Sequence, residues 1–410
     1  MLQNSNKYTQ IIAAAALFGL SSTPLLGAGF QLAERSVSGL GRAFSGEAAI
    51  ADDASVIASN AAGMILLDDG AISVGLQYIR PNVDAKGVHP DPMVGAVSGS
   101  DIAEDAFIPY FYYSRKISDN VSVGLGIYSS FGLATDYSSS FAATVGTDLS
   151  EITTITINPS IAYRISDKFT IGAGIDIMYA EGELTNSLGG VPFFELEGDD
   201  WSIGWNIGLL YEVTENTRIG IQYRSSIDLN IEGTAKLGAG FGPFAGSYDA
   251  TLDVELPDVI ELSAYHELNN QWAVHGDITW TGWSSFKTLS PKTGNAVVDP
   301  GLETPENWND SFRYAIGTTY KHSEKVTYRA GIALDESPVS DKYRTLRIPD
   351  GDRLWLSIGA TVKLNDHFNL DLAYTHIFTD DTKVGPNEAG FTGKVGGDVD
   401  LFGIGISGSF

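Results

Sequence analysis

The 410-residue sequence contains no cysteine, few basic residues and, beyond its first 27 residues, no apolar run approaching the length of a membrane-spanning helix. The lack of cysteine excludes disulfide bonds and thiolate metal sites. The 25 Lys and Arg residues stand against 51 Asp and Glu residues, which gives a net charge of −26. This excess of acid disfavours nucleic acid and cytoplasmic-leaflet lipid as partners, because both attract basic surfaces.

The sequence also lacks the spacings of common catalytic and metal sites. Its six histidines stand singly, and no Gly-x-Ser-x-Gly elbow occurs. Acidic pairs such as Asp52-Asp53 and Asp199-Asp200 are more typical of solvated loops than of cation sites. We therefore expect no catalytic residues, no cofactor and no metal site.

The N-terminus has the pattern of a secretory signal over residues 1–27. Lys7 supplies the positive start, and Ile11–Leu20 is an apolar run too short to span a bilayer. Cleavage is expected beside Ala28. A cysteine-free chain suits passage through an oxidising periplasm.

The segment Ala28–Gly70 is rich in Gly, Ala and Ser. It shows neither strand alternation nor a long helical stripe, and we expect at most short helical turns, for example within Gly46–Ala58. Small residues suit close packing inside another structure. This segment is therefore predicted to be a plug, called the hatch below.

Residues 71–410 alternate between apolar and small or polar residues, as in Val121–Ile127 and Leu354–Val362. Such alternation predicts strands with one apolar face and one small or polar face, a pattern that a soluble sandwich shares. The polar face of a sandwich meets bulk water and need not be rich in glycine, as this face is. Short polar turns separate units of two strands and one long loop; they lie at Ser118–Asn120, Ser166–Lys168, Thr214–Thr217, Leu268–Asn270, Ser323–Lys325 and Leu364–Asp366. The pattern predicts an all-β membrane protein, a 14-stranded antiparallel transmembrane β-barrel whose last strand ends in Phe410.

A barrel of fourteen strands leaves a lumen that side chains alone do not fill, so it must hold water, a plug or both. The hatch directly precedes the first expected strand. The seven tryptophans fall near expected strand ends, where they fit an interfacial girdle or, equally, an ordinary core; they are Trp201, Trp205, Trp272, Trp280, Trp283, Trp308 and Trp355.

Several segments of the chain resemble one family. The hatch sequences Gly29–Leu32, Ser38–Glu47 and Ala49–Ala54 resemble the N-terminal hatch of the FadL/TodX outer-membrane transporters of long-chain fatty acids and other hydrophobic compounds. Further similarity covers Gly132–Thr135, Trp205–Gly208, Tyr223–Ser225, Gln271–Ala273, Arg313, Ala315–Tyr320, Asp335–Val339, Ile348–Asp350 and Asp352–Arg353. The resemblance implies a plugged barrel in the outer membrane of a Gram-negative bacterium, with lateral passage of substrate into the membrane.

Two departures from the family pattern bear on substrate and gating. The hatch turn that carries Asn-Pro-Ala in the family reads Asn60-Ala61-Ala62 here, and loss of proline predicts a less rigid turn. The positions that match the family's basic head-group residues fall near Asn186 and Thr304, which are neutral. Arg344 or Arg347 would then have to supply any charge for a carboxylate.

The resemblance also implies an exit beside an inward kink in the third strand, which matches Ser129–Leu133 with Phe131, Gly132 and Leu133. A mid-strand glycine gives Gly132 an independent reason to bend. Phe30, near the free end of the hatch, is expected to insert its ring beside a ligand. An outer capture patch of exposed aromatic rings is expected at Phe141, Phe193, Phe194, Phe241 and Phe244.

These features favour a passive outer-membrane channel for hydrophobic molecules, with long-chain fatty acids ahead of uncharged alkanes or monoaromatics. A polar porin would lack such a hatch, and an adhesive or structural barrel would not depend on it. The expected partners are a hydrophobic small molecule, outer-membrane lipid and lipopolysaccharide. By resemblance, the protein is expected to be a monomer.

Overall fold

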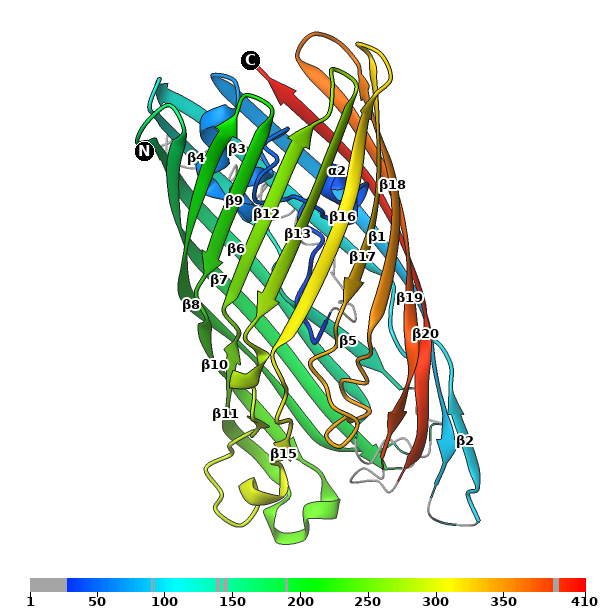
Figure 1. The fold of residues 1–410 in the computed structure, drawn as a ribbon. Helices are drawn as coiled ribbons and strands as arrows, with labels where there is room; N and C mark the ends of the chain where they lie inside the picture. Colours follow the sequence, from blue (N-terminus) through cyan, green and yellow to red (C-terminus); the bar gives the residue numbers. More distant parts are fainter. Residues whose placement is uncertain are drawn as a thin grey trace, which may run out of the picture.

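The computed structural model describes residues 28–89, 91, 93–137, 141, 143, 147–188, 191–385 and 391–410, and the expected signal segment 1–27 lies outside them. The alternating residues form one closed antiparallel sheet, in which the first strand β1 (Gly70–Val88) pairs along its length with the last strand β20 (Thr392–Ser409) (Figure 1). The prediction of a fourteen-stranded barrel is confirmed.

Three of the fourteen wall strands are each divided into two pieces, and β2 (Ala96–Gly99) is a short extension paired with β1. The divided strands are β4 (Val121–Tyr128) with β5 (Gly132–Asp136), β9 (Thr217–Arg224) with β10 (Ile227–Leu237), and β11 (Gly246–Leu256) with β12 (Val259–Glu267). Besides β1 and β20, the undivided strands are β3 (Ala106–Ser118), β6 (Leu149–Arg164), β7 (Phe169–Leu188), β8 (Val191–Thr214), β13 (Trp272–Thr281), β16 (Ser311–Lys321), β17 (Val326–Asp335), β18 (Arg353–Lys363) and β19 (Phe368–Val384).

The six short turns connect strands at one end of the barrel, the upper end in Figure 1, where the C-terminus also lies. The opposite end carries the long loops, with small elements η2 (Ala239–Phe244), η3 (Trp283–Ser285), β14 (Thr288–Leu289), η4 (Asp299–Gly301) and β15 (Thr304–Pro305). Several strands run further into the loop regions than alternation predicts. For example, β7 and β8 leave only residues 189 and 190 between them.

The hatch lies inside the barrel, as the dark blue chain of Figure 1 shows. It forms three short helical pieces: α2 (Val37–Leu40), α3 (Val56–Ser59) and the 3-10 helix η1 (Ala61–Leu66). The Ser36 hydroxyl caps α2 by accepting a hydrogen bond from Gly39 N–H. No helix in the described part of the chain is long and apolar enough to span a membrane.

Glycines on the lumen face of the wall make room for the hatch backbone. A Cβ on Gly359 of β18 would stand 2.7 Å from the Cα of hatch residue Gly41, well inside ordinary van der Waals contact. Cβ atoms on other wall glycines would likewise meet hatch atoms, and these glycines are Gly172, Gly208, Gly220 and Gly331. The glycine-rich face of the strands is therefore the surface on which the hatch is seated.

The outer face of the wall is apolar and exposed, with Ile203, Ile316 and Ile358 as prominent examples. The tryptophans divide between the two faces. Trp201, Trp205 and Trp272 are exposed, whereas Trp283, Trp308 and Trp355 are buried inside the protein. A girdle of all seven is therefore wrong, because three of the rings turn into the lumen.

Candidate functional site

The hatch is held to the wall by hydrogen bonds between wall side chains and hatch backbone. Asp277 accepts from Gly46 N–H at 2.8 Å, and Glu261 accepts from Ala48 N–H at 3.0 Å. In the other direction, Arg313 donates to the carbonyl of Ala43 at 2.7 Å, and Arg224 donates to that of Ala58 at 2.8 Å. Charged partners strengthen such bonds, so these contacts fix the middle of the hatch.

A buried ion cluster reinforces this attachment from within the hatch. Arg42 donates to Glu47 at 2.6 Å and lies 3.4 Å from Asp52, which Arg329 of β17 also contacts at 2.9 Å. Burial raises the pKa of Glu47 from 4.5 to about 7, although Arg42 opposes this shift. The hatch thus contains a carboxyl group that titrates near neutral pH.

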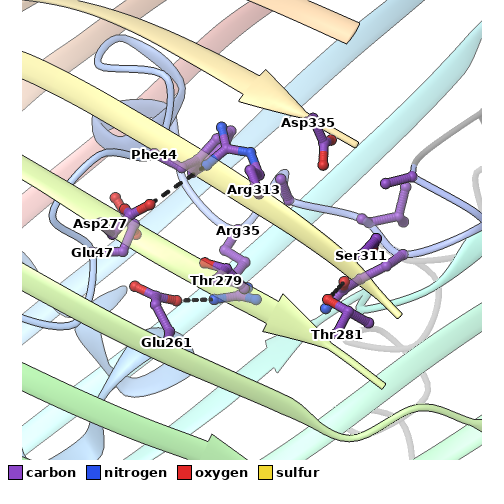
Figure 2. Close-up of a pocket in the computed structure, with 14 residues that line it drawn as sticks. Arg35, Phe44, Glu47, Glu261, Asp277, Thr279, Thr281, Ser311, Arg313 and Asp335 are labelled. Carbon is purple, nitrogen blue, oxygen red and sulfur yellow. Dashed lines mark hydrogen bonds and ion pairs between the residues drawn. The ribbon is translucent and has the colours of Figure 1, made fainter. Parts of the chain in front are cut away.

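Next to this cluster lies a polar cavity of about 50 Å³, drawn in Figure 2. Charged side chains face it from both hatch and wall, with Arg35 3.5 Å from Glu261 and Arg313 4.0 Å from Asp277. A cavity with this lining suits water and not an apolar ligand.

A second cavity, also of about 50 Å³, lies between the hatch and the wall and is called the lumen pocket below. Its exposed surface is apolar; it is lined by Phe30, Leu133, Ser150, Glu151, Ile152, Gly182, Leu184, Ile231, Leu252, Val254, Phe286, Leu289, Arg347 and Ile348. A cavity that accepts benzene measures about 150 Å³. A hydrophobic ligand therefore fits only if one of the lining side chains moves.

Phe30 is the lining side chain that belongs to the hatch. Its ring packs against Trp283 with centroids 4.6 Å apart, against Phe286 and Trp308 at 5.7 Å, and against Phe131 at 6.1 Å. The sequence analysis missed Trp283, Phe286 and Trp308. No local signal marked them, because an aromatic residue after a strand end looks the same whether it faces lipid or lumen.

The residue before Phe30 is fixed as tightly. Gly29 has φ +65°, and a Cβ there would overlap the rings of Trp283 and Trp308, so this position requires glycine. Its N–H donates to Asp350 Oδ2 at 3.0 Å. Asp350 in turn pairs with Arg353 and accepts from the Ser337 hydroxyl, which ties the start of the hatch to the 336–352 loop.

The structure places an interruption of the third wall strand beside Phe30. β4 ends at Tyr128 and β5 begins at Gly132. The intervening segment pairs with the hatch: Leu32 N–H donates to the carbonyl of Ser130, and Gly132 N–H donates to that of Phe30, both at 2.9 Å. Among the described residues, β5 pairs with β6 alone, whereas β4 pairs with both β3 and β6. The wall ladder is therefore discontinuous at this point.

The two candidate arginines differ in their surroundings. Arg344 donates to Asp341 and to the carbonyls of Val339 and Asp350 in its own loop, and to the carbonyl of Lys383 in β19 at 3.1 Å. Arg347 stands at the edge of the lumen pocket and donates to Ser150 Oγ at 2.6 Å and to Asn186 Oδ1 at 2.9 Å. A base from another loop thus reaches the neutral position Asn186.

Four of the five rings expected in the capture patch come together at the loop end of the barrel. Phe193 lies 5.9 Å from Phe241, and Phe194 and Phe244 pack in the same region. Phe141 lies apart, stacked 4.8 Å from Tyr137. The expectation of exposure is wrong for Phe141 and Phe194, which are 2% and 4% exposed, because loop aromatics here fold onto the core.

The hatch turn at Asn60-Ala61-Ala62 is held by the asparagine side chain. Its oxygen accepts from Ala62 N–H at 3.0 Å, while its nitrogen donates to the carbonyls of Ala48 at 2.8 Å and Leu209 at 3.1 Å. Asn60 thereby links the turn both to the hatch and to β8. In the described part of the chain, no group of three His, Asp or Glu side chains is arranged to hold a metal ion.

Comparison with known proteins gives consistent matches over nearly the whole chain. Residues 19–410 match the family model described as outer membrane protein transport protein (OMPP1/FadL/TodX). The chain is 34% identical to the "Long-chain fatty acid transport protein" of Escherichia coli O6:H1, over 97% of this chain and 98% of that protein. It is also 34% identical to the "47 kDa outer membrane protein" of Pasteurella multocida, over 99% of each chain.

Solved structures share the fold. A FadL homologue of Pseudomonas aeruginosa superposes with a TM-score of 0.85 at 22% identity, covering 93% of this chain and all of that one. The toluene transporter TodX of Pseudomonas putida superposes with a TM-score of 0.70 at 18% identity, covering 93% of this chain and all of that one. At these identities the superpositions establish the architecture.

Proposed function

Since this chain belongs to the OMPP1/FadL/TodX family of outer-membrane transport proteins, we propose that it is a passive channel for the uptake of hydrophobic molecules. Long-chain fatty acids are the favoured substrate class, because two relatives from Escherichia coli, at 34% and 31% identity, are named "Long-chain fatty acid transport protein". The observation that carries the proposal is the apolar lumen pocket, enclosed by Phe30 of the hatch and lying beside the interrupted third strand.

The physical basis is the low solubility of such substrates. Each CH₂ group gains about 0.8 kcal/mol on leaving water, so an open aqueous pore gives a hydrophobic molecule no reason to enter. A series of apolar surfaces, in contrast, lets the molecule leave water at each step. In the proposed route, Phe193, Phe241 and Phe244, which are half-buried at the loop end, capture the molecule. The lumen pocket then holds it, and the gap at Ser129–Phe131 releases it sideways into the membrane.

Phe30 is proposed to gate this route. The lumen pocket is too small for a ligand while the Phe30 ring is in place, and Phe30 also hydrogen-bonds through its carbonyl to Gly132 at the gap. A ligand that displaces the ring therefore also disturbs the backbone contact that covers the gap. Displacement of Phe30 by a ligand would therefore enlarge the lumen pocket and open the exit at the same time.

Uncharged alkanes or monoaromatics are the alternative substrates, because the exposed surface of the lumen pocket is apolar. Arg347 at its edge supports the fatty acid instead, since a guanidinium binds a carboxylate through two parallel hydrogen bonds. A monomeric state and contact with lipopolysaccharide remain proposals as well.

The test is binding and uptake of oleate, a matched alkane and toluene, by the purified protein and by cells that carry it. We expect uptake of at least one of them, and Gly132→Val should reduce it by closing the gap. Ala360→Val, on the outer face of the undivided strand β18, is the matched control. A Gly132→Val barrel that assembles normally and transports at the full rate would refute lateral release. Unchanged control of transport after deletion of the hatch would favour a structural or adhesive barrel.

A further inference from the structure

The wall has a second discontinuity, away from the interrupted third strand. The eighth wall strand divides at Pro257 and Asp258 into β11 and β12. β12 pairs with β13, but within the fully described stretch 191–385 the ladder of β11 pairs with β10 alone. Beyond that ladder, β11 is joined to the next loop by a single bridge, Thr251 to Lys292. One edge of β11 is thus almost unpaired.

A cavity of about 450 Å³ opens along this edge and is called the side cavity below. It is lined by Asp228, Leu229, Asn230, Asp253, Val254, Glu255, Ser285, Phe286, Lys287 and Thr288. The volume exceeds the roughly 150 Å³ that one benzene ring needs. The side-cavity residues 285–288 follow Trp280, the last aromatic residue of β13, by five to eight positions, near the strand ends where an interfacial girdle of aromatic residues is expected.

Two residues line both the side cavity and the lumen pocket, namely Val254 and Phe286. These side chains are therefore the partition between the two spaces. Leu133, directly after the gap in the third strand, also lines the lumen pocket. The lumen pocket thus has lining residues next to both discontinuities of the wall.

The charges of the side cavity bear on what can pass. Asp228, Asp253 and Glu255 are exposed there together with Lys287, and Lys292 pairs with Asp253. The remaining acids repel a carboxylate, and the apolar lumen pocket behind them penalises any group that enters without its hydration. An uncharged hydrocarbon meets neither obstacle.

We propose that the side cavity is a lateral entrance through which small uncharged hydrocarbons reach the lumen pocket, separate from the capture patch and from the gap in the third strand. Movement of Phe286 or Val254 admits them. This inference rests on the proposed function. It assigns a separate entry route to each substrate class: hydrocarbons enter through the wall, and carboxylates enter through the loop end.

The test uses the absence of native cysteine, which makes thiol labelling site-specific. Thr288→Cys and Glu255→Cys place single thiols on two sides of the side cavity. Ser247→Cys, on the same hairpin and exposed but outside the cavity lining, is the control. Each variant is checked for heat-modifiable mobility, labelled with a bulky methanethiosulfonate, and assayed for uptake of radiolabelled toluene and oleate.

We expect labelling of either cavity variant to lower toluene uptake by half or more, with oleate uptake and the control unchanged. Toluene uptake that is unaffected by labels at both positions would overturn the lateral entrance. An equal loss of toluene and oleate uptake would overturn it too, because it would show that the label disturbs the shared pocket. Unlabelled protein that takes up neither compound would refute the proposed function, and the entrance with it.

Discussion

The seating of the hatch on wall glycines predicts that one added methyl group loosens the hatch without harming the barrel. In Gly359→Ala, the new Cβ would stand 2.7 Å from Gly41 Cα, where ordinary contact begins at 3.4 Å. The end of α2 must retreat, and the 3.1 Å hydrogen bond from the Thr375 hydroxyl to the Leu40 carbonyl weakens with it.

Overpacking of this kind costs about 1–3 kcal/mol, and a lost hydrogen bond about 0.5–1.5 kcal/mol. Together these two effects should lower the free energy of hatch docking by about 2 kcal/mol, which raises the population of a displaced hatch about 30-fold. The methyl group points into the lumen, and its contact with the wall, 3.2 Å to the Leu372 carbonyl oxygen of β19, is milder than its contact with the hatch.

The assay is the reactivity of a thiol buried in the hatch. Ser55 is buried, so Ser55→Cys reports hatch displacement in a chain that has no other cysteine. The control is Gly182→Ala, whose Cβ would meet no hatch atom, only the tip of the Ile231 side chain at 3.3 Å and the Glu151 carbonyl at an ordinary 3.7 Å. Equal reactivity in the two backgrounds would refute the idea that wall glycines seat the hatch.

Three further predictions address the gate, the head group and pH. Phe30→Ala removes the ring packed among Trp283, Phe286 and Trp308. Each aromatic pair that is lost contributes about 0.5–1.5 kcal/mol to holding the gate closed. Hydrophobic uptake should therefore become faster and less selective, as measured by the rates of toluene and oleate uptake. Arg347→Gln should lower oleate affinity about tenfold or more and leave toluene binding unchanged, since a charged hydrogen bond contributes about 1.5–3 kcal/mol; an equal effect on both ligands would assign Arg347 to loop structure. Because burial raises the pKa of Glu47 to about 7, hatch docking is strongest below pH 4.5 and weakens as the pH rises through about 7. Ser55→Cys reactivity, normalised to the unfolded protein, should follow this course, and Glu47→Gln should make it shallower. Burial also raises the pKa of Glu34 in the hatch to about 7, so part of the pH dependence should remain.

The barrel could be predicted because its signals are local. Alternation along Leu354–Val362 and turns such as Leu364–Asp366 depend only on neighbouring residues. The division of wall strands at Ser225 and Pro257 could not be predicted from the sequence, because it depends on which neighbouring strand each half pairs with. The alternation of residues along one strand does not show which strands pair with it across the sheet.

The candidate site was predicted in outline only. Phe30 and Gly132 were found because they match a family pattern, and the structure brings them into contact. Burial of Phe141 and the inward turn of Trp283 were missed, since both depend on where a loop folds back. The role of the wall glycines that contact the hatch could not be predicted, because it depends on where the hatch packs inside the barrel.

The seam between β1 and β20 joins the first wall strand to the last. The hatch directly precedes β1, and the cylinder closes only when these two strands meet. Until they meet, the wall does not enclose the hatch. Its many small residues and few large apolar ones are suited to that interval, because an exposed hatch offers little surface on which a half-built barrel could aggregate.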